Sequence, residues 1–507
     1  MRANAKSTSV PAPVGGWNAR DSIADMSAID AAALTNWFPG TTDVMVRKGY
    51  SQHSTGMNSQ VETLLAYAGG ATDKLFSFTA DGKIYDVTSG GAVGAASVSG
   101  LSNGRWETQN ISTSGGNFAL CVNGTDKLRG YSGTAWWTDG DGTHDITGFD
   151  TATASNITLF KNRIWFIQKN TLTAWYLPTS SIAGAAAQFP LQSIARLGGY
   201  LIDFATWTID AGYGVDDFFA FVTSKGEVIV YKGTDPASVN TWGLVGVWIL
   251  GAPVGKRCLM KYEGDLLLIG QDGLSPMSGA LQSSRVNPRV QLTDKIQKAV
   301  SDAVTNYGST FGWETLYFPK QNMLILNVPV SIGAQEQYVM NTITKNWCRF
   351  TGWNANTWCL FQDIPYFGGN GFVGKAWNTF GDNGSNISAT ASQAFSYFKS
   401  PGIIKRFTLI RPILNTDGSP GISANLNIDF QINTNSSPIS TTPVTSATWD
   451  TSVWDTGVFS SGLQITKYWQ GASGVGYSAA PQVVTVTNGI ELHWVSTDIV
   501  FETGGIL

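Results

Sequence analysis

Short apolar stretches that meet at tight turns recur along most of the chain. In each unit an apolar strand leads into a turn and a second strand rich in aromatic side chains, a pattern typical of β-hairpins. The seven predicted hairpins turn at Gly82, Gly124, Asn170, Gly226, Gly273, Gly333 and Gly371. A propeller blade takes about 40–50 residues, and turns at comparable intervals predict a divergent six- or seven-bladed β-propeller over residues 61–400. Stacked β-sandwiches with similar hairpins are the alternative.

Residues 1–60 differ from this pattern and are interpreted as an extended N-terminal arm with one short helix. Apolar side chains within 21–36 fall at spacings that permit a helical stretch, and the aromatic, Pro and Gly residues at 37–40 end it. The apolar side chains are Ile23, Met26, Ile29 and Leu34.

One segment inside the propeller region has helical periodicity. Over residues 292–304, apolar side chains recur every three or four positions, which places them on one face of a helix. Lys298 lies four residues from Asp294 and four from Asp302, and such opposite charges support a helix. We predict an inserted helix that serves either as an internal brace or as a packing element against a neighbouring subunit.

Residues 401–507 combine alternating strands with a one-sided charge. Stretches at 426–432, 482–487 and 490–495 alternate apolar and polar positions, which predicts a β-sandwich-like C-terminal domain. From residue 412 onward this domain has a single basic side chain, Lys467. Its acidic residues are Asp417, Asp429, Asp450, Asp455, Glu491, Asp498 and Glu502.

Charged residues are scarce in the whole chain and nearly balanced in sign. They make up 13% of the 507 residues, with 32 basic against 36 acidic side chains. This composition excludes a disordered chain, a coiled coil and a basic nucleic-acid-coating protein, because no cationic stripe is available to bind phosphates. The N-terminus lacks the apolar run of a secretory signal, and the most apolar segment, 242–254, is too short for a membrane helix. We expect a soluble protein.

The sequence contains no strong catalytic or metal-binding pattern. The three histidines (His53, His144 and His493) are far apart, and the four cysteines (Cys121, Cys258, Cys348 and Cys359) form no CxxC pair and are expected to be buried thiols. The glycine-rich segment 369–375 resembles a phosphate-binding loop but is expected to turn a hairpin instead. Adjacent carboxylates such as Asp216 and Asp217 point to opposite faces of a strand, which does not suit a glycosidase. We therefore expect no enzymatic activity, no cofactor and no metal.

Tryptophan is abundant and calls for a structural explanation. Trp449 and Trp454 each precede an aspartate and lie five residues apart, at the start of the C-terminal domain. Large aromatic rings of this kind anchor cores and subunit interfaces. Together with Trp17 and Trp37 they are candidates for assembly contacts.

Several stretches together resemble the tail structural proteins of short-tailed bacteriophages. They are the segment Gly-Gly-Trp-Asn-Ala-Arg-Asp at 15–21 with Met26, Asp30, Ala31 and Leu34; residues 36–39, Val44 and 46–50; residues 176–178 through 189–191; residues 226–228 through 231–236; and the Trp-Asp pair from Thr448. The chain is similar to the tail nozzle or tail tubular protein B family, and more distantly to the packaged-DNA-stabilisation proteins of the tail.

The resemblance implies a non-enzymatic virion protein that is assembled in the host cytoplasm. In this family, six propeller-bearing subunits form a homohexameric ring below an adaptor ring near the portal. The ring is the distal tail channel for DNA retention and ejection, and tail fibres or a needle are further partners. Duplex DNA is expected to pass through without specific binding.

An acidic wall would suit such a conduit, because each neutralised phosphate adds affinity and so slows the sliding of DNA. The seven acidic C-terminal residues are candidates for this channel lining, and a solvated acidic exterior is the alternative. Two other functions remain open: a receptor- or glycan-binding propeller of the tail, including a glycosidase, and an internal scaffold or ejected protein.

Overall fold

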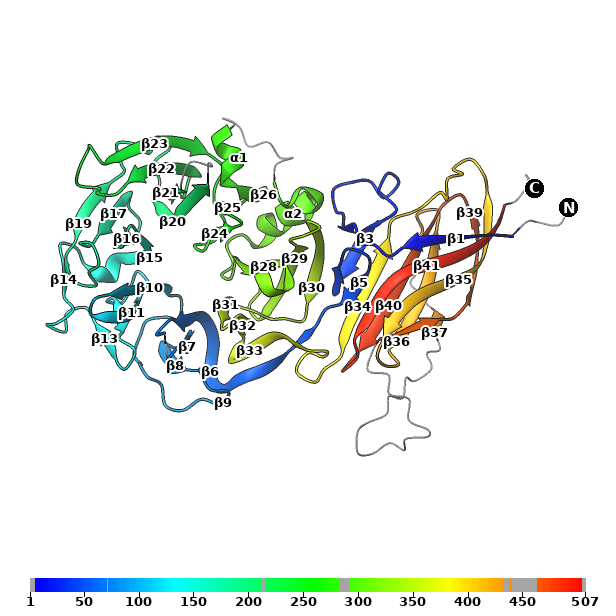
Figure 1. The fold of residues 1–507 in the computed structure, drawn as a ribbon, viewed down its shortest axis with the longest axis horizontal. Coiled ribbons are helices and arrows are strands. Elements are labelled where there is room, and N and C mark those ends of the chain that lie inside the picture. The colour runs from blue at the N-terminus through cyan, green and yellow to red at the C-terminus, as the bar shows by residue number, and fades with distance from the viewer. Residues whose placement is uncertain are drawn as a thin grey trace.

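A computed structural model describes residues 5–70, 72–210, 215–282, 291–432, 437–439 and 463–503. The fold is mainly β: a ring of small sheets, a β-propeller, is joined on one side to a β-sandwich, and both chain ends lie at the far end of the sandwich (Figure 1).

Seven sheets surround the propeller axis in the described part of the chain, and each contributes its first strand to the centre. These first strands neighbour one another in chain order, and the last returns to the first, so the ring closes. The strands, sheet by sheet, are β6 (Gly49–Tyr67), β7 (Lys74–Thr79) and β8 (Lys83–Asp86); β10 (Glu107–Thr113), β11 (Gly116–Val122), β12 (Arg129–Tyr131) and β13 (Trp136–Thr138); β15 (Ala154–Phe160), β16 (Arg163–Gln168), β17 (Thr173–Tyr176) and β19 (Ala187–Pro190); β20 (Leu201–Asp210), β21 (Val215–Thr223), β22 (Glu227–Gly233) and β23 (Trp242–Ile249); β24 (Leu259–Tyr262), β25 (Asp265–Gly270) and β26 (Gly273–Pro276); β27 (Glu314–Phe318), β28 (Met323–Ser331), β29 (Ala334–Asn341) and β30 (Asn346–Thr351); and β31 (Thr357–Phe361), β32 (Ile364–Gly368) and β33 (Asn370–Thr379).

One long strand, β6, closes the ring. Its first half pairs with β33 and its second half pairs with β7, so it belongs to both the last and the first blade. Because of this closure, the first and last blades are joined by backbone hydrogen bonds. A closed propeller in this way avoids exposed strand edges, which other sheets protect with charged side chains. The blade number is therefore seven.

All seven predicted hairpins are confirmed. Each joins the second and third strands of one blade, as between β7 and β8 in the first blade. Each predicted turn residue has a positive φ, between 59° at Asn170 and 121° at Gly273. This left-handed region favours Gly and Asn, which explains why the turns are visible in the sequence.

The predicted helix is confirmed with shifted bounds. A 3₁₀ turn, η3 (Asp294–Ile296), leads into α2 (Gln297–Tyr307), and a second short helix, α1 (Met277–Gln282), follows β26. Val300 and Ala303 of α2 are buried in the apolar cluster beneath the fifth and sixth blades. The helix is therefore an internal brace. The remaining short elements are β9 (Gly91–Ala92), β14 (Ile146–Thr147), β18 (Gly184–Ala185), η1 (Thr151–Thr153) and η4 (Pro319–Gln321).

Two packed sheets form the sandwich, and strands from both chain ends build them. One sheet has the order β38-β35-β41-β5-β4, with β1 on β41 and β39 on β35. The other continues from blade strand β30 through β3, β34, β40, β36 and β37, with β2 on β3, so one sheet spans propeller and sandwich. The bounds are β1 (Ala5–Pro11), β2 (Gly16–Trp17), β3 (Asp30–Thr35), β4 (Trp37–Pro39), β5 (Val44–Val46), β34 (Ile387–Gln393), β35 (Lys405–Thr416), β36 (Gly421–Ile428), β37 (Ser437–Ile439), β38 (Gln464–Lys467), β39 (Gln470–Gly476), β40 (Ala479–Thr487) and β41 (Leu492–Thr503).

The expectation of a helix-bearing N-terminal arm is wrong for the described residues. Strand β1 pairs along β41, from Ala5 opposite Glu502 to Pro11 opposite Ser496. The predicted helix within 21–36 is replaced by turns and by β3, which pairs with β34. Ile23 and Ile29 are exposed, so the apolar spacing does not build a helical face, and pairing with strands far along the chain decides the conformation.

Cys121, Cys258 and Cys348 are buried and Cys359 is half-buried, all as free thiols, as expected. No helix in the described ranges has the length and apolar character required to cross a bilayer.

One histidine holds the N-terminal strands against the sandwich. His493 on β41 bonds the Asp43 carboxylate at 2.7 Å and the Glu491 carboxylate at 3.1 Å. Burial opposes its protonation, but the two carboxylates outweigh burial and raise the pKa of His493. The folded state therefore binds this proton more tightly than the unfolded chain does.

We expect His493→Gln to reduce the free energy of unfolding by roughly 1 kcal/mol at pH 6, the order of a charged hydrogen bond. The stabilisation is complete below the ordinary histidine pKa and is lost as the pH rises through the raised value, so the difference between the two proteins shrinks with rising pH. Urea titrations at several pH values measure this. A control, His53→Gln, changes a ring that bonds a backbone carbonyl, and an equal pH dependence of both variants would contradict the assignment.

Candidate functional site at the mouth of the propeller

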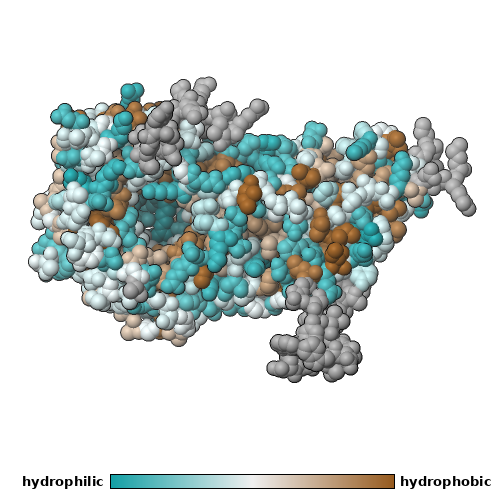
Figure 2. Space-filling view, in the orientation of Figure 1, coloured by the Kyte–Doolittle hydropathy of each residue, from teal (hydrophilic) through white to brown (hydrophobic). Residues whose placement is uncertain are grey.

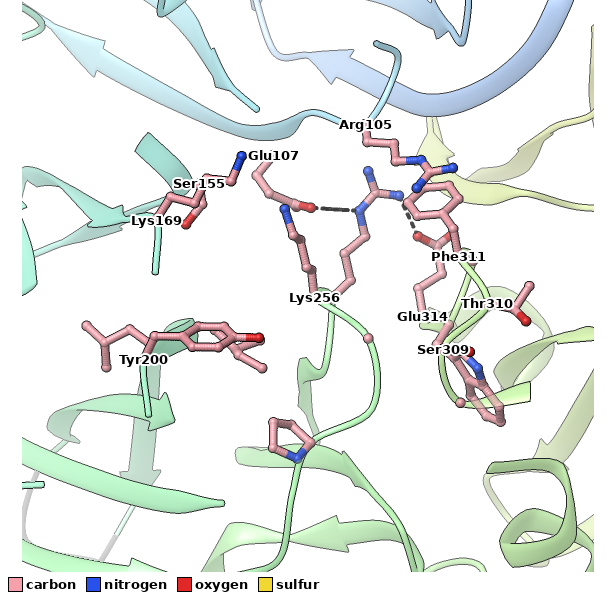
Figure 3. Close-up of a pocket in the computed structure, with 18 of the residues that line it drawn as sticks. Arg105, Glu107, Ser155, Lys169, Tyr200, Lys256, Ser309, Thr310, Phe311 and Glu314 are labelled. Carbon is pink, nitrogen blue, oxygen red and sulfur yellow. Dashed lines mark hydrogen bonds and ion pairs between the residues drawn. The ribbon is translucent and has the colours of Figure 1, made fainter. Parts of the chain in front are cut away.

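The candidate site lies at one end of the propeller axis. Successive strands of a blade are antiparallel, so the start of each first strand and the turn between the second and third strands lie at the same end of the ring. A cavity of about 400 Å³ opens there, lined by the starts of several first strands and by the turn at Lys169 and Asn170. Figure 2 shows the ring hollowed at its centre, and Figure 3 shows the lining side chains.

Arg257 links five blades across this mouth. The residue lies just before β24 of the fifth blade, and its side chain is 18% exposed. Its guanidinium donates to carboxylates of Glu107 at 3.2 Å and Glu314 at 2.9 Å (Figure 3). It also donates to the hydroxyls of Thr63 at 2.8 Å and Thr357 at 2.9 Å, and to the Trp106 carbonyl at 2.9 Å. These partners belong to, or directly precede, β6, β10, β27 and β31.

The Glu314 carboxylate depends on this arginine. Burial raises the pKa of Glu314, and Arg257 acts against that shift by favouring the ionised form. Glu314 also accepts hydrogen bonds from the backbone amide of Trp358, which ties it to the seventh blade. Without Arg257, a carboxylate only 7% exposed would have no cationic partner among the described residues.

An aromatic loop forms one wall of the cavity. The loop at 308–313 follows α2 and is held by the Trp313 indole, which donates to the Tyr307 carbonyl at 2.9 Å. Phe311 at its tip lies 4.4 Å from the Arg105 guanidinium, which in turn pairs with Glu62 at 2.9 Å. The inserted helix therefore positions a loop of the cavity wall as well as bracing the blades.

Two lysines at the mouth lack a carboxylate bonded to them in the described chain. Lys256 rises from the loop before β24 toward Glu107 (Figure 3), the carboxylate that pairs with its chain neighbour Arg257. Burial lowers the pKa of Lys256; Glu107 opposes this, while nearby Lys169, Arg105 and Arg257 add to it. Lys169 donates to a backbone carbonyl, that of Gly124, at 3.0 Å.

Asp203, at the start of β20, is a buried carboxyl behind the same wall. It accepts hydrogen bonds from the amides of Phe204 at 2.8 Å and Leu259 at 3.2 Å and from Asn156 at 2.8 Å. Burial, with a smaller contribution from Glu107, raises the pKa of Asp203 to about 7. Its role is to hold the fourth and fifth blades together.

The tryptophans proposed as assembly contacts lie elsewhere. Trp37 is fully buried and packs against Trp494, with ring centroids 6.1 Å apart, so its ring is out of reach of another subunit. Trp17 is half-buried and packs against Tyr338 at 5.2 Å, between the propeller and the sandwich. Trp449 and Trp454 lie outside the described residues.

The described acidic residues proposed as a channel lining lie at several places in the sandwich, and among them Asp417 and Glu491 are neighbours. Asp417 precedes β36 and Asp429 follows it, so they lie at opposite ends of that strand. Each accepts backbone amide hydrogen bonds at 2.8 Å, Asp417 from Glu491 and Asp429 from Tyr477 and Ser478. Glu491 itself bonds His493.

Two further acidic residues are neutralised by neighbours. Asp498 pairs with Arg411 at 2.5 Å and Glu502 lies 3.9 Å from Arg406. Both arginines belong to β35 and precede residue 412, so a charge count that begins there misses them. Asp450 and Asp455 lie outside the described residues, and the acidic lining stays a prediction.

The sequence analysis missed the axial cluster entirely. Its members are single residues in or before first strands, separated by tens to hundreds of positions: Glu62, Glu107, Asp203, Arg257 and Glu314. A partial signal was present, because charged residues are rare in this chain and Glu107 and Glu314 each begin the first strand of a blade.

Comparisons with known proteins give structural likeness only. No family model matches the chain, and no curated protein matches it. The β-propeller domain of Myceliophteria thermophila Cps50 (Swd1) covers 65% of this chain and 100% of its own length, with 13% identity and a TM-score of 0.41. BBS1N from a complex with ARL6DN covers 66% and 99%, with 11% identity and a TM-score of 0.40, and YCF48 bound to D1 peptide covers 71% and 99%, with 9% identity and a TM-score of 0.37.

We expect Arg257→Met to destabilise the protein by about 3–5 kcal/mol, because it leaves buried carboxylates without a cation. Lys74→Met, which removes a more exposed pair with Asp86, should cost less than about 1 kcal/mol. The double variant Arg257→Met/Glu314→Gln should recover part of the loss. Chemical unfolding measures all three, and equal costs for Arg257→Met and Lys74→Met would refute the linking role.

Proposed function

We propose that this chain is a structural subunit of a short bacteriophage tail, one of six copies in a nozzle ring through which DNA is retained and ejected. The resemblance of its N-terminal and internal stretches to tail nozzle proteins motivates the proposal. The observation that carries it is an apolar outer face on the sandwich.

The outer sandwich face is defined here as the solvent side of β35, β38, β39 and β41. Strand pairing places Ile465 beside Asn415 and Val475 beside Arg406, and these two apolar side chains are 68% and 58% exposed. Other exposed members are Leu409, Trp469 and Val495. Figure 2 shows hydrophobic residues gathered over the sandwich. Apolar groups grouped in this way are typical of surfaces that a partner covers.

The polar groups of this face also suit a protein interface. The Arg411–Asp498 pair lies among the apolar side chains, and the Arg411 guanidinium packs on Trp469 at 4.4 Å. Arginine and tryptophan are enriched in interface cores, and the ion pairs leave little free charge to desolvate. A second copy of this chain is the occupant that ring assembly requires.

The propeller axis is not a route for DNA within one subunit. Arg257 and its partners bridge opposite blades across the mouth, and the cavity there holds only about 400 Å³. A conduit for duplex DNA must therefore lie between subunits, which is the arrangement of a ring. The net charge of −4 is consistent with a wall that does not retain DNA.

A binding propeller is the second candidate, and the axial cavity favours it. A glycan-cleaving propeller would need one protonated carboxyl group and one free carboxylate on the two sides of the glycosidic bond. Glu107 and Glu314 are both bonded to Arg257, which fits a structural role better than hydrolysis. Binding without cleavage is the form of this alternative that the cavity supports.

We expect Ile465→Asp and Val475→Asp to weaken ring assembly at least tenfold in dissociation constant, about 1.4 kcal/mol or more, because each would bury a charge at the subunit contact. Val239→Asp changes an even more exposed apolar residue in the propeller and serves as the control. Mass photometry over a concentration series measures assembly, and circular dichroism verifies folding. Undiminished assembly of both sandwich variants would count against this interface.

A further inference from the structure

We propose that the axial cavity is a binding site for a small oxyanion, a phosphate or carboxylate group, contacted by Lys256 and Lys169. This site is independent of ring assembly. It assigns a ligand class to the mouth of the propeller and names the side chains that recognise it.

Among the described residues, the arginines of the cavity are paired with carboxylates, whereas its two lysines are not. Arg257 is bonded to two carboxylates and Arg105 to one, so both arginines are neutralised by the protein. Lys256 has no hydrogen-bonding or ion-pairing partner in the described ranges, and Lys169 reaches only a backbone carbonyl. Glu107 favours the charged form of Lys256, whereas burial and the nearby cations Lys169, Arg105 and Arg257 oppose it, so a bound anion would stabilise this ammonium group.

The shape of the cavity limits the ligand. Its volume of about 400 Å³ is that of a small-molecule pocket. The two lysines come from the loop before β24 and from the turn between β16 and β17, and Ser309 and Thr310 of the loop at 308–313 also line the cavity. These hydroxyls are additional hydrogen-bond donors for anionic oxygens. A duplex cannot enter such a recess, so the cations here do not form a DNA-binding surface.

The test is isothermal titration calorimetry of the full chain with inorganic phosphate, and separately with citrate. The ionic strength is fixed, and the buffer is a zwitterionic amine that adds no phosphate or carboxylate anion. We expect saturable binding of at least one probe, and the stronger probe distinguishes a phosphate from a carboxylate site. Lys256→Met and Lys169→Met should each weaken binding at least tenfold. Lys345→Met, at a surface lysine paired with Glu263, should bind as the unmodified chain does.

A second measurement separates ligand contact from a structural role. Lys256→Met removes a charge without a bonded carboxylate, so we expect no loss of thermal stability, and the bound probe should protect Lys256 from acetylation in mass spectrometry. Absence of saturable binding at millimolar phosphate and citrate would overturn the proposal, as would binding that Lys256→Met leaves unchanged. The same titration on Ile465→Asp shows whether binding persists when assembly is lost, so the two proposals can fail separately.

Discussion

The architecture depends on how a ring of seven blades is held at its centre. Neighbouring blades share apolar clusters, one of which spans three consecutive blades, but among the described residues none of these clusters joins blades on opposite sides of the axis. The Arg257 guanidinium joins strands of the first, second, sixth and seventh blades to the fifth, and every one of its partners is a polar group at the start of a first strand or just before it. A planar group with five donors suits this task, because it can satisfy several acceptors from different directions at once.

The sandwich extends the same closed β-structure outward. Strand β30 of the sixth blade pairs with β3, and β3 pairs with β34, so backbone hydrogen bonds continue from the propeller into the sandwich. Strand β1 then fixes the beginning of the chain to β41 near its end. The sandwich therefore joins segments that lie on both sides of the propeller in the sequence. The outer sandwich face is thereby presented on a rigid support, which a subunit contact requires.

Local turn chemistry explains what could be predicted from the sequence. The seven hairpins were found because Gly or Asn at each turn takes a positive φ, a property of the residue itself. Strand β3 was mistaken for a helix because its partners, β34 and β30, lie more than three hundred residues away. The Arg257 cluster was missed for the same reason, since its members meet only when the ring closes. Trp37 was misjudged because a buried and an interface tryptophan look alike in sequence.

The difference between local patterns and contacts of distant residues also matters for function. The fold class follows from periodic local patterns, whereas the ring proposal rests on a surface that strand register creates, and the oxyanion proposal rests on side chains from separate blades. Electron cryomicroscopy of the assembled protein tests the central claim most directly. The account predicts a six-fold ring with the outer sandwich face, including Ile465 and Val475, buried between neighbouring subunits and an axial channel wide enough for duplex DNA. A monomer at micromolar concentration, or a ring in which this face remains in solvent, would contradict it.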